Sequence, residues 1–164
     1  MGVAIVNALS EAGIDLVASL PEGRTAGLIE AIASDERFVH VELTREDEGV
    51  AVCSGAWFGG RRACLFVQNA GLLKSVCELA KLSLFAQIPL LMLVMYRGDL
   101  GEPHWYHGTV GRVTVPVLDA LGVKHFSLDG GRDAARVVCG ARQLAEVNGQ
   151  PVAVLLSQRA VEAP

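Results

Sequence analysis

The sequence lacks the features of a membrane-spanning, secreted or nucleic-acid-binding protein. Its 164 residues contain no apolar run approaching the roughly 18–20 needed to span a bilayer, because Gln87 and Pro89 interrupt the longest candidate, residues 82–96. The formal net charge is −4 and no basic cluster is present, which argues against nucleic acid as the main partner. The N-terminal residues have no charged segment before their apolar stretch, and they predict a helix rather than a signal peptide.

Metal and disulfide patterns are also missing. The four cysteines form no CxxC pair and have no zinc-like spacing with the four histidines, so no metal site is expected within the chain. Cys53, Cys64 and Cys77 lie in apolar runs and are predicted to be small buried hydrophobic residues. We therefore expect a reduced, cytoplasmic protein.

Phosphate-binding motifs are absent as well. There is no GxxxxGK[ST] segment and no GxGxxG segment after a predicted strand. The chain therefore has no phosphate-binding loop of its own that the sequence reveals.

Apolar residues, in contrast, are plentiful. They make up 51% of the sequence, and the mean hydropathy is +0.38, which is high for one domain of this length. Residues 1–164 are expected to form a single domain with a substantial core. The excess of apolar residues suggests burial against a partner subunit.

Strand and helix patterns alternate about six times along the chain. The predicted strands are residues 14–20, 38–43, 63–67, 88–95, 123–126 and 150–156. Predicted helices cover residues 3–11, 25–32, 44–58, a segment ending near 85, 114–121 and 132–147. Several strands are apolar throughout, as expected when both faces of a sheet are covered. The pattern predicts an α/β fold with a parallel sheet between two layers of helices.

The stretch from residue 44 to residue 60 brings three acids to the start of a buried helix. Thr44 is expected to cap this helix, with the Asp47 carboxylate reaching back to it. One interpretation is that Glu46, Asp47 and Glu48 only stabilise the helix through its dipole, each by roughly 0.3–1 kcal/mol. The other is that one acid faces inward and acts on a ligand, and periodicity alone does not choose between Glu46 and Glu48.

Spacing alone favours the structural interpretation, although the neighbours of Glu46 are compatible with the second one. On a helix it shares a stripe with Gly49, Val50, Cys53 and Trp57, whose small members would let a flat ligand or a second subunit approach. In a parallel sheet, ligands bind beyond the carboxyl ends of the strands. The segments 21–24, 44–48 and 68–74 would meet there, joined by a long loop at 97–111.

These segments carry a resemblance to a known family. Glu46 with Gly55 nine residues later, VQNAGL at 67–72, IPLLMLV at 88–94 and RGDLGE at 97–102 resemble the pyrimidine-binding domain of thiamine-diphosphate enzymes. Within that superfamily the sequence is most similar to the sulfopyruvate decarboxylase alpha subunit and to the matching part of phosphonopyruvate decarboxylase. The resemblance covers nearly the whole chain.

The resemblance implies a six-stranded parallel sheet and a role for each part of the site. It implies that Glu46 is the catalytic glutamate, which bonds N1′ of the coenzyme's aminopyrimidine. It further implies that Pro21, Gln68, Asn69 and Gly71 line the coenzyme pocket. The implied reaction is decarboxylation of a 2-oxo acid.

A second subunit is implied too. In this superfamily a domain marked by Gly-Asp-Gly and a later Asn holds the diphosphate and a divalent metal, and nothing in this sequence matches it. The implied partner is a diphosphate-binding beta subunit that holds Mg²⁺, in a hetero-oligomer with two or more copies of each chain.

Four further residues are candidates for binding the substrate. The family's Gly-Leu-Gly-Asn turn appears here as residues 71–74 with Lys74 at its end, which either pairs with an anionic substrate or is a solvated helix residue. In the loop at 97–111, which can act as a lid, Arg97 can grip an oxyanion bidentately and His104 and His107 can donate to one. Alternatively, Trp105 and its neighbours form an interface patch and the histidines are ordinary polar residues.

Three functions remain open from the sequence. The first is a decarboxylase subunit, the second is a carboligase subunit, and the third is a non-catalytic binding or assembly module on the same fold. An acid at Glu46 favours the catalytic functions, because an inert module does not need one on that stripe.

Overall fold

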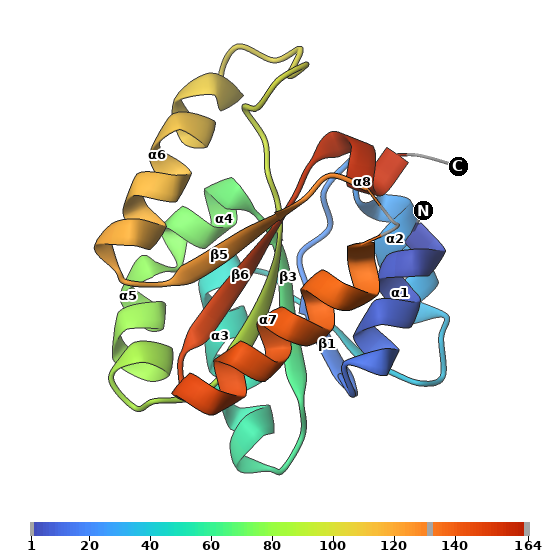
Figure 1. Ribbon diagram of the computed structural model, residues 1–164, viewed down its shortest axis with the longest axis vertical. Helices are drawn as coiled ribbons and strands as arrows, with labels where there is room; N and C mark the ends of the chain where they lie inside the picture. The colour runs from blue at the N-terminus through green and yellow to red at the C-terminus, as the bar shows by residue number, and fades with distance from the viewer. Residues whose placement is uncertain (1, 131–132, 163–164) are drawn as a thin grey trace.

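The computed structural model of the protein describes residues 2–130 and 133–162 (Figure 1). Six parallel strands form one sheet in the order β2-β1-β3-β4-β6-β5. The strands are β1 (Leu16–Ser19), β2 (Val39–Glu42), β3 (Ala63–Gln68), β4 (Leu90–Met95), β5 (Lys124–Leu128) and β6 (Pro151–Leu156). The predicted α/β fold with a six-stranded parallel sheet is confirmed.

Helices cover both faces of this sheet (Figure 1). One face carries α1 (Gly2–Glu11), α2 (Ala26–Ala33), α7 (Ala134–Asn148) and α8 (Gln158–Glu162). The other carries α3 (Glu46–Phe58), α4 (Asn69–Lys74), α5 (Val76–Glu78), the π-helix η1 (Leu79–Leu84) and α6 (His107–Ala120). Among the described residues, no helix is both long enough and apolar enough to cross a membrane.

The central strand β4 shows why several strands are apolar at every position. Its residues alternate between the two faces and all six are buried. Leu91, Leu93 and Met95 join the core under α1 and α7, whereas Leu90, Met92 and Val94 join the core under α3 and α6. Both faces of the strand therefore exclude water, and an alternating polar pattern is not needed.

The strands end together at one edge of the sheet. Ser19 at the end of β1 pairs with Glu42 of β2, and Gln68 at the end of β3 pairs with Met95 of β4. The helix that follows β1 covers one face of the sheet, and the helix that follows β3 covers the other face. A crevice therefore opens between the carboxyl ends of these two strands. A second crevice lies between β4 and β6, whose following helices α6 and α8 also cover opposite faces.

Three details differ from the sequence predictions. Helix α6 begins at His107, so the loop after β4 is shorter than predicted. The helix predicted to reach residue 85 is interrupted at Ser75, whose hydroxyl donates a hydrogen bond to the carbonyl oxygen of Gly71. The prediction of a buried Cys77 is wrong, because this thiol is exposed, whereas Cys53 and Cys64 are buried as predicted. Arg132, the predicted first residue of the last long helix, lies outside the described residues.

The cap of α3 also differs from the prediction. The helix begins at Glu46, so its capping residue is Arg45, and neither Thr44 nor Asp47 has the predicted role. The Glu48 carboxylate reaches back instead and accepts hydrogen bonds from the backbone amides of Thr44 at 2.7 Å and Arg45 at 3.3 Å. An arginine side chain has no acceptor atom, so Arg45 cannot accept a hydrogen bond from the first amides of the helix. The side-chain part of the cap is therefore provided by Glu48 alone.

We predict opposite effects on stability for two glycines of α3. A Cβ at Gly49 would lie 2.5 Å from Cδ1 of Leu65 and 2.6 Å from Cδ1 of Leu43, whereas a Cβ at Gly55 would meet nothing within 4 Å. Gly49→Ala should lower the free energy of unfolding by about 1–3 kcal/mol through overpacking. Gly55→Ala should raise it by up to about 1 kcal/mol, because alanine is the better helix former. Urea unfolding of both variants measures this, and equal effects would contradict the described packing of α3 on β3.

Candidate active site

Glu46 is the first residue of α3 and lies at the carboxyl end of the sheet, four residues after β2. Its side chain rests against Gly71 of α4. A Cβ at Gly71 would lie 2.9 Å from both Cβ and Cδ of Glu46 and still closer to its Cγ. The side chain is only 17% exposed, and its Oε2 lies 3.0 Å from Nζ of Lys74. Helix α4 therefore provides both the space for this acid and a cation beside it.

The other two acids of this turn have different partners. Glu48 caps the helix, and Asp47 forms a bidentate pair with the exposed guanidinium of Arg45, at 3.0 and 2.6 Å. These hydrogen bonds hold the pKa of both carboxyls below their usual values. Of the three acids, Glu46 is the one whose carboxylate pairs with a residue of α4.

Asn69 joins three elements beneath this site. Its side chain is fully buried, and its Nδ2 donates to the carbonyl oxygen of Arg97 at 2.9 Å and to Oγ1 of Thr114 at 3.0 Å. Its Oδ1 accepts a hydrogen bond from the backbone amide of Arg97 at 3.2 Å. The predicted coenzyme-lining residue Asn69 therefore fixes the ends of β3 and β4 relative to α6. Gln68, just before it, is half-buried at the end of β3.

Arg97 lies two residues after the end of β4 and is 5% exposed. Its Nε and Nη2 donate to the two carboxylate oxygens of Glu102 at 2.7 and 3.0 Å, and its Nη1 donates to Oε1 of Glu22 at 2.5 Å. We call Arg97, Glu22 and Glu102 the Arg97 clamp. The bidentate contact that the sequence predicted for a substrate oxyanion is thus made to Glu102 of the same chain.

Glu102 is the most heavily bonded carboxylate of the site. Besides Arg97, it accepts hydrogen bonds from the backbone amides of Gly98 at 3.3 Å and His104 at 3.2 Å. Nη1 of Arg24 lies 3.5 Å from its Oε2. The bonds from Arg97, followed by those from the two amides, lower the pKa of Glu102 to about 2, so it is ionised at neutral pH.

The predicted histidines lie together after the clamp. The rings of His104 and Tyr106 stack with centroids 5.4 Å apart, and the ring of His107 is 4.4 Å from Tyr106. Burial, followed by the positive charge of Arg97, lowers the pKa of His107, which favours its neutral form at pH 7. Leu100 and Trp105, on the same loop, are 94% and 91% exposed.

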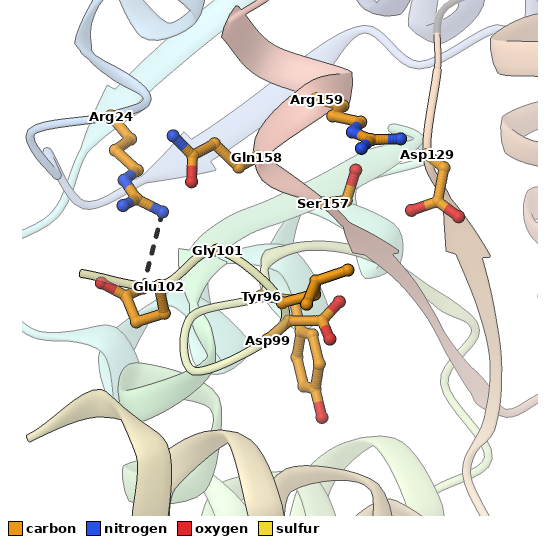
Figure 2. Close-up of a pocket in the computed structure, with 10 residues that line it drawn as sticks. Arg24, Tyr96, Asp99, Gly101, Glu102, Asp129, Ser157, Gln158 and Arg159 are labelled. Carbon is orange, nitrogen blue, oxygen red and sulfur yellow. Dashed lines mark hydrogen bonds and ion pairs between the residues drawn. The ribbon is translucent and has the colours of Figure 1, made fainter. Parts of the chain in front are cut away.

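A cleft of about 880 Å³ lies beside the clamp, at the second crevice of the sheet (Figure 2). Figure 2 shows Arg24 and Glu102 on one side of it and Asp129, Ser157 and Arg159 on the other. Glu46 is not among its lining residues. The cleft and the candidate acid therefore mark two different parts of the carboxyl edge.

Sequence reasoning missed some of these residues. The partners of Arg97 were not anticipated, because Glu22 lies 75 positions away and nothing local indicates the contact. Asp129 and Ser157 had a usable signal, since each directly follows a strand and so must lie at the carboxyl edge. Pro21, a predicted coenzyme-lining residue, is exposed in the turn after β1 that also contains Glu22.

Comparison with solved structures supports the class of fold. The chain is similar to 2-oxoglutarate:ferredoxin oxidoreductase from Magnetococcus marinus, with a TM-score of 0.77 and 18% identity over 98% of this chain and 29% of that chain. The two share a parallel α/β fold. No protein-family model matches the chain.

Curated relatives identify the family. The chain is 32% identical to the sulfopyruvate decarboxylase subunit alpha of Methanococcus maripaludis, over 93% of this chain and 92% of that protein. It is 29% identical to the subunit of the same name from Methanocaldococcus jannaschii, over 93% and 90%. It is also 34% identical to phosphonopyruvate decarboxylase of Streptomyces viridochromogenes, over 70% of this chain but 29% of that protein. The chain belongs to the sulfopyruvate decarboxylase alpha-subunit family, and the resemblance noted in the sequence is confirmed.

The contact between Glu46 and Gly71 leads to a prediction. Gly71→Ala should push the Glu46 side chain away from α4, break its pair with Lys74 and lower the free energy of unfolding by about 1–3 kcal/mol. A crystal structure and urea unfolding of the variant measure both effects. Gly27→Ala is the matched control, because a Cβ there would meet nothing within 4 Å. An unmoved Glu46 in the Gly71 variant would contradict this account.

Proposed function

We propose that this chain is the pyrimidine-binding subunit of a two-subunit, thiamine-diphosphate-dependent enzyme that decarboxylates a 2-oxo acid. The observation that carries the proposal is Glu46, a largely shielded carboxylate at the carboxyl edge of a parallel sheet in a chain of this family. Carboligation is the alternative reaction for the same site, and product analysis separates the two.

The residues around Glu46 fit an aminopyrimidine. Oε2 of Glu46 pairs with Lys74, whereas Oε1 has no hydrogen bond to any residue in the described part of the chain. One carboxylate oxygen is thus open to the N1′ atom of a pyrimidine ring. The lack of a side chain at Gly71 lets the Glu46 side chain lie against α4, which fixes where its carboxylate would meet the ring.

Thiamine diphosphate, when bound, supplies the electron sink that a 2-oxo acid needs to lose carbon dioxide. Glu46 would hold the proton at N1′, and Pro21, Gln68 and Gly71 would line the coenzyme pocket. The Gln68 carboxamide has no side-chain hydrogen bond within the described residues and lies at the end of β3. Asn69 would contribute by keeping β3, β4 and α6 in place rather than by direct contact, since its side chain is fully engaged.

The proposed substrate carries a second anionic group besides its carboxylate, as the names of the relatives indicate for theirs. Lys74 is half exposed beside Glu46 and would attract such a group. His104 and His107 would donate hydrogen bonds to it. Arg97 would act indirectly, because its guanidinium is paired within the clamp.

The proposed partner is a beta subunit that binds the diphosphate and Mg²⁺. Its support is the absence of a phosphate-binding motif in this sequence and the "subunit alpha" names of the relatives. We propose a cytoplasmic hetero-oligomer containing two or more copies of each subunit. An active site completed by a second chain also explains why the single-chain cleft does not include Glu46.

Mixing experiments test the division between subunits. Thiamine diphosphate binding, measured by calorimetry with Mg²⁺, should be undetectable for this chain alone and strong for its mixture with a beta subunit that carries the Gly-Asp-Gly motif. Turnover of sulfopyruvate or phosphonopyruvate should likewise require both chains. Full binding and turnover by the beta subunit alone would contradict the proposal.

Substitution of Glu46 tests the catalytic role. In the reconstituted complex, Glu46→Gln should lower kcat roughly 10²–10⁴-fold, the range expected for loss of an acid–base group. Glu48→Gln is the matched control, because glutamine also serves in a capping box and kcat should stay near the wild-type value. Unchanged kcat in Glu46→Gln would refute the role. A complex that binds coenzyme but turns over no 2-oxo acid would instead identify a non-catalytic module.

A further inference from the structure

The Arg97 clamp joins two segments that are distant in the sequence. Glu22 lies in the turn after β1, and Glu102 lies in the loop between β4 and α6. The side chains of Arg97 and Glu102 are 6% and 7% exposed, so their bidentate pair is shielded from water. Charge-assisted bidentate contacts of this kind are stronger and more directional than exposed ion pairs.

The clamp also fixes the backbone that leads to the histidines. The Glu102 carboxylate accepts from the amides of Gly98 and His104, one on each side of it in the loop. Gly98 has a positive φ of 87°, and a Cβ there would overlap the carbonyl oxygen of His107. The loop therefore folds back onto the start of α6 and is held at several points by one carboxylate.

The base of the clamp is itself rigid. Asn69 bonds both the amide and the carbonyl of Arg97, and the Tyr96 hydroxyl donates to the carbonyl oxygen of Gly111 on α6 at 2.8 Å. Arg24 lies beside Glu102 as a second cation. The charge of the shielded Arg97 guanidinium is compensated by the two carboxylates that it contacts.

We propose that Arg97 is a positioning residue: through Glu102 and Glu22 it holds residues 98–107 in one conformation and thereby presents His104 and His107 to the substrate. The presentation to substrate rests on the function proposed above, whereas the restraint on the loop does not. The oxyanion of the substrate meets the histidines, and the guanidinium of Arg97 stays with its two carboxylates throughout.

Hydrogen exchange tests the restraint independently of catalysis. In Glu102→Gln and in Arg97→Lys, the amides of Gly98 and His104 should exchange roughly 10- to 100-fold faster than in the wild type, as loss of charge-assisted hydrogen bonds implies. Arg97→Lys keeps the charge but loses the bidentate contact. The control is Arg37→Met, which removes the bidentate pair between Arg37 and Asp35. This pair lies on the exposed surface and is distant in sequence from residues 98–107. Exchange in residues 98–107 should not change in the control.

Kinetics of the reconstituted complex test the consequence. The KM for the 2-oxo acid should rise about tenfold or more in both Glu102→Gln and Arg97→Lys, and the rise should be the smaller of the two in Arg97→Lys. The Kd for thiamine diphosphate should not change in either variant. Unchanged exchange at Gly98 and His104 in both folded variants would overturn the proposal. A parallel loss of coenzyme affinity would overturn it too, because the clamp would then serve the coenzyme pocket. A wild-type complex without activity would refute the proposed function. The hydrogen-exchange result alone would then test whether the clamp restrains residues 98–107.

Discussion

The close contact between Glu46 and Gly71 is the constraint on which the candidate active site depends. Helix α3 can place an acid against α4 only because position 71 has no Cβ. Gly49, one turn further along α3, also lacks a Cβ, and this lets α3 pack closely against Leu43 and Leu65. A helix held this close to the sheet presents its first residue at the carboxyl edge, where ligands of parallel α/β proteins bind.

Charge is divided between two separate groups at this edge. Arg97 and its carboxylates satisfy one another internally, and their shielded position leaves little capacity for an external ion. Lys74 differs, because it is half exposed and has Glu46 as its one ion-pair partner in the described residues. A coenzyme ring that engages Oε1 of Glu46 would leave Lys74 paired with Oε2, and the half-exposed ammonium group would lie next to the ring, in position to attract an anionic substrate. Lys74, the residue that departs from the family's turn, is thus coupled to the candidate acid Glu46.

The strands buried on both faces were the features that the sequence predicted best. Contacts between residues far apart in the sequence were the features that it predicted worst. β4 and β6 were predictable because all their positions are apolar. The start of α6 was missed because Gly108 and Gly111 lower its helix propensity, although Gly111 is needed where its Cα approaches Gly98. A one-residue error in the cap of α3 gave Asp47 the role that Glu48 has. Arg97 was predicted to meet a substrate because its partners Glu22 and Glu102 cannot be inferred from local pattern.

The loop after β4 bears on two interpretations that the sequence left open, a substrate-binding lid and an interface patch. Its inner side is fixed by Glu102, and His107 is partly buried against it, as a substrate-facing residue would be. Its outer side carries Leu100 and Trp105, almost fully exposed. Large exposed apolar side chains that gather on one surface are typical of a protein–protein contact. A loop held rigidly from within and apolar on its outside suits both roles at once, because a second subunit that covers Trp105 would close the site over the histidines.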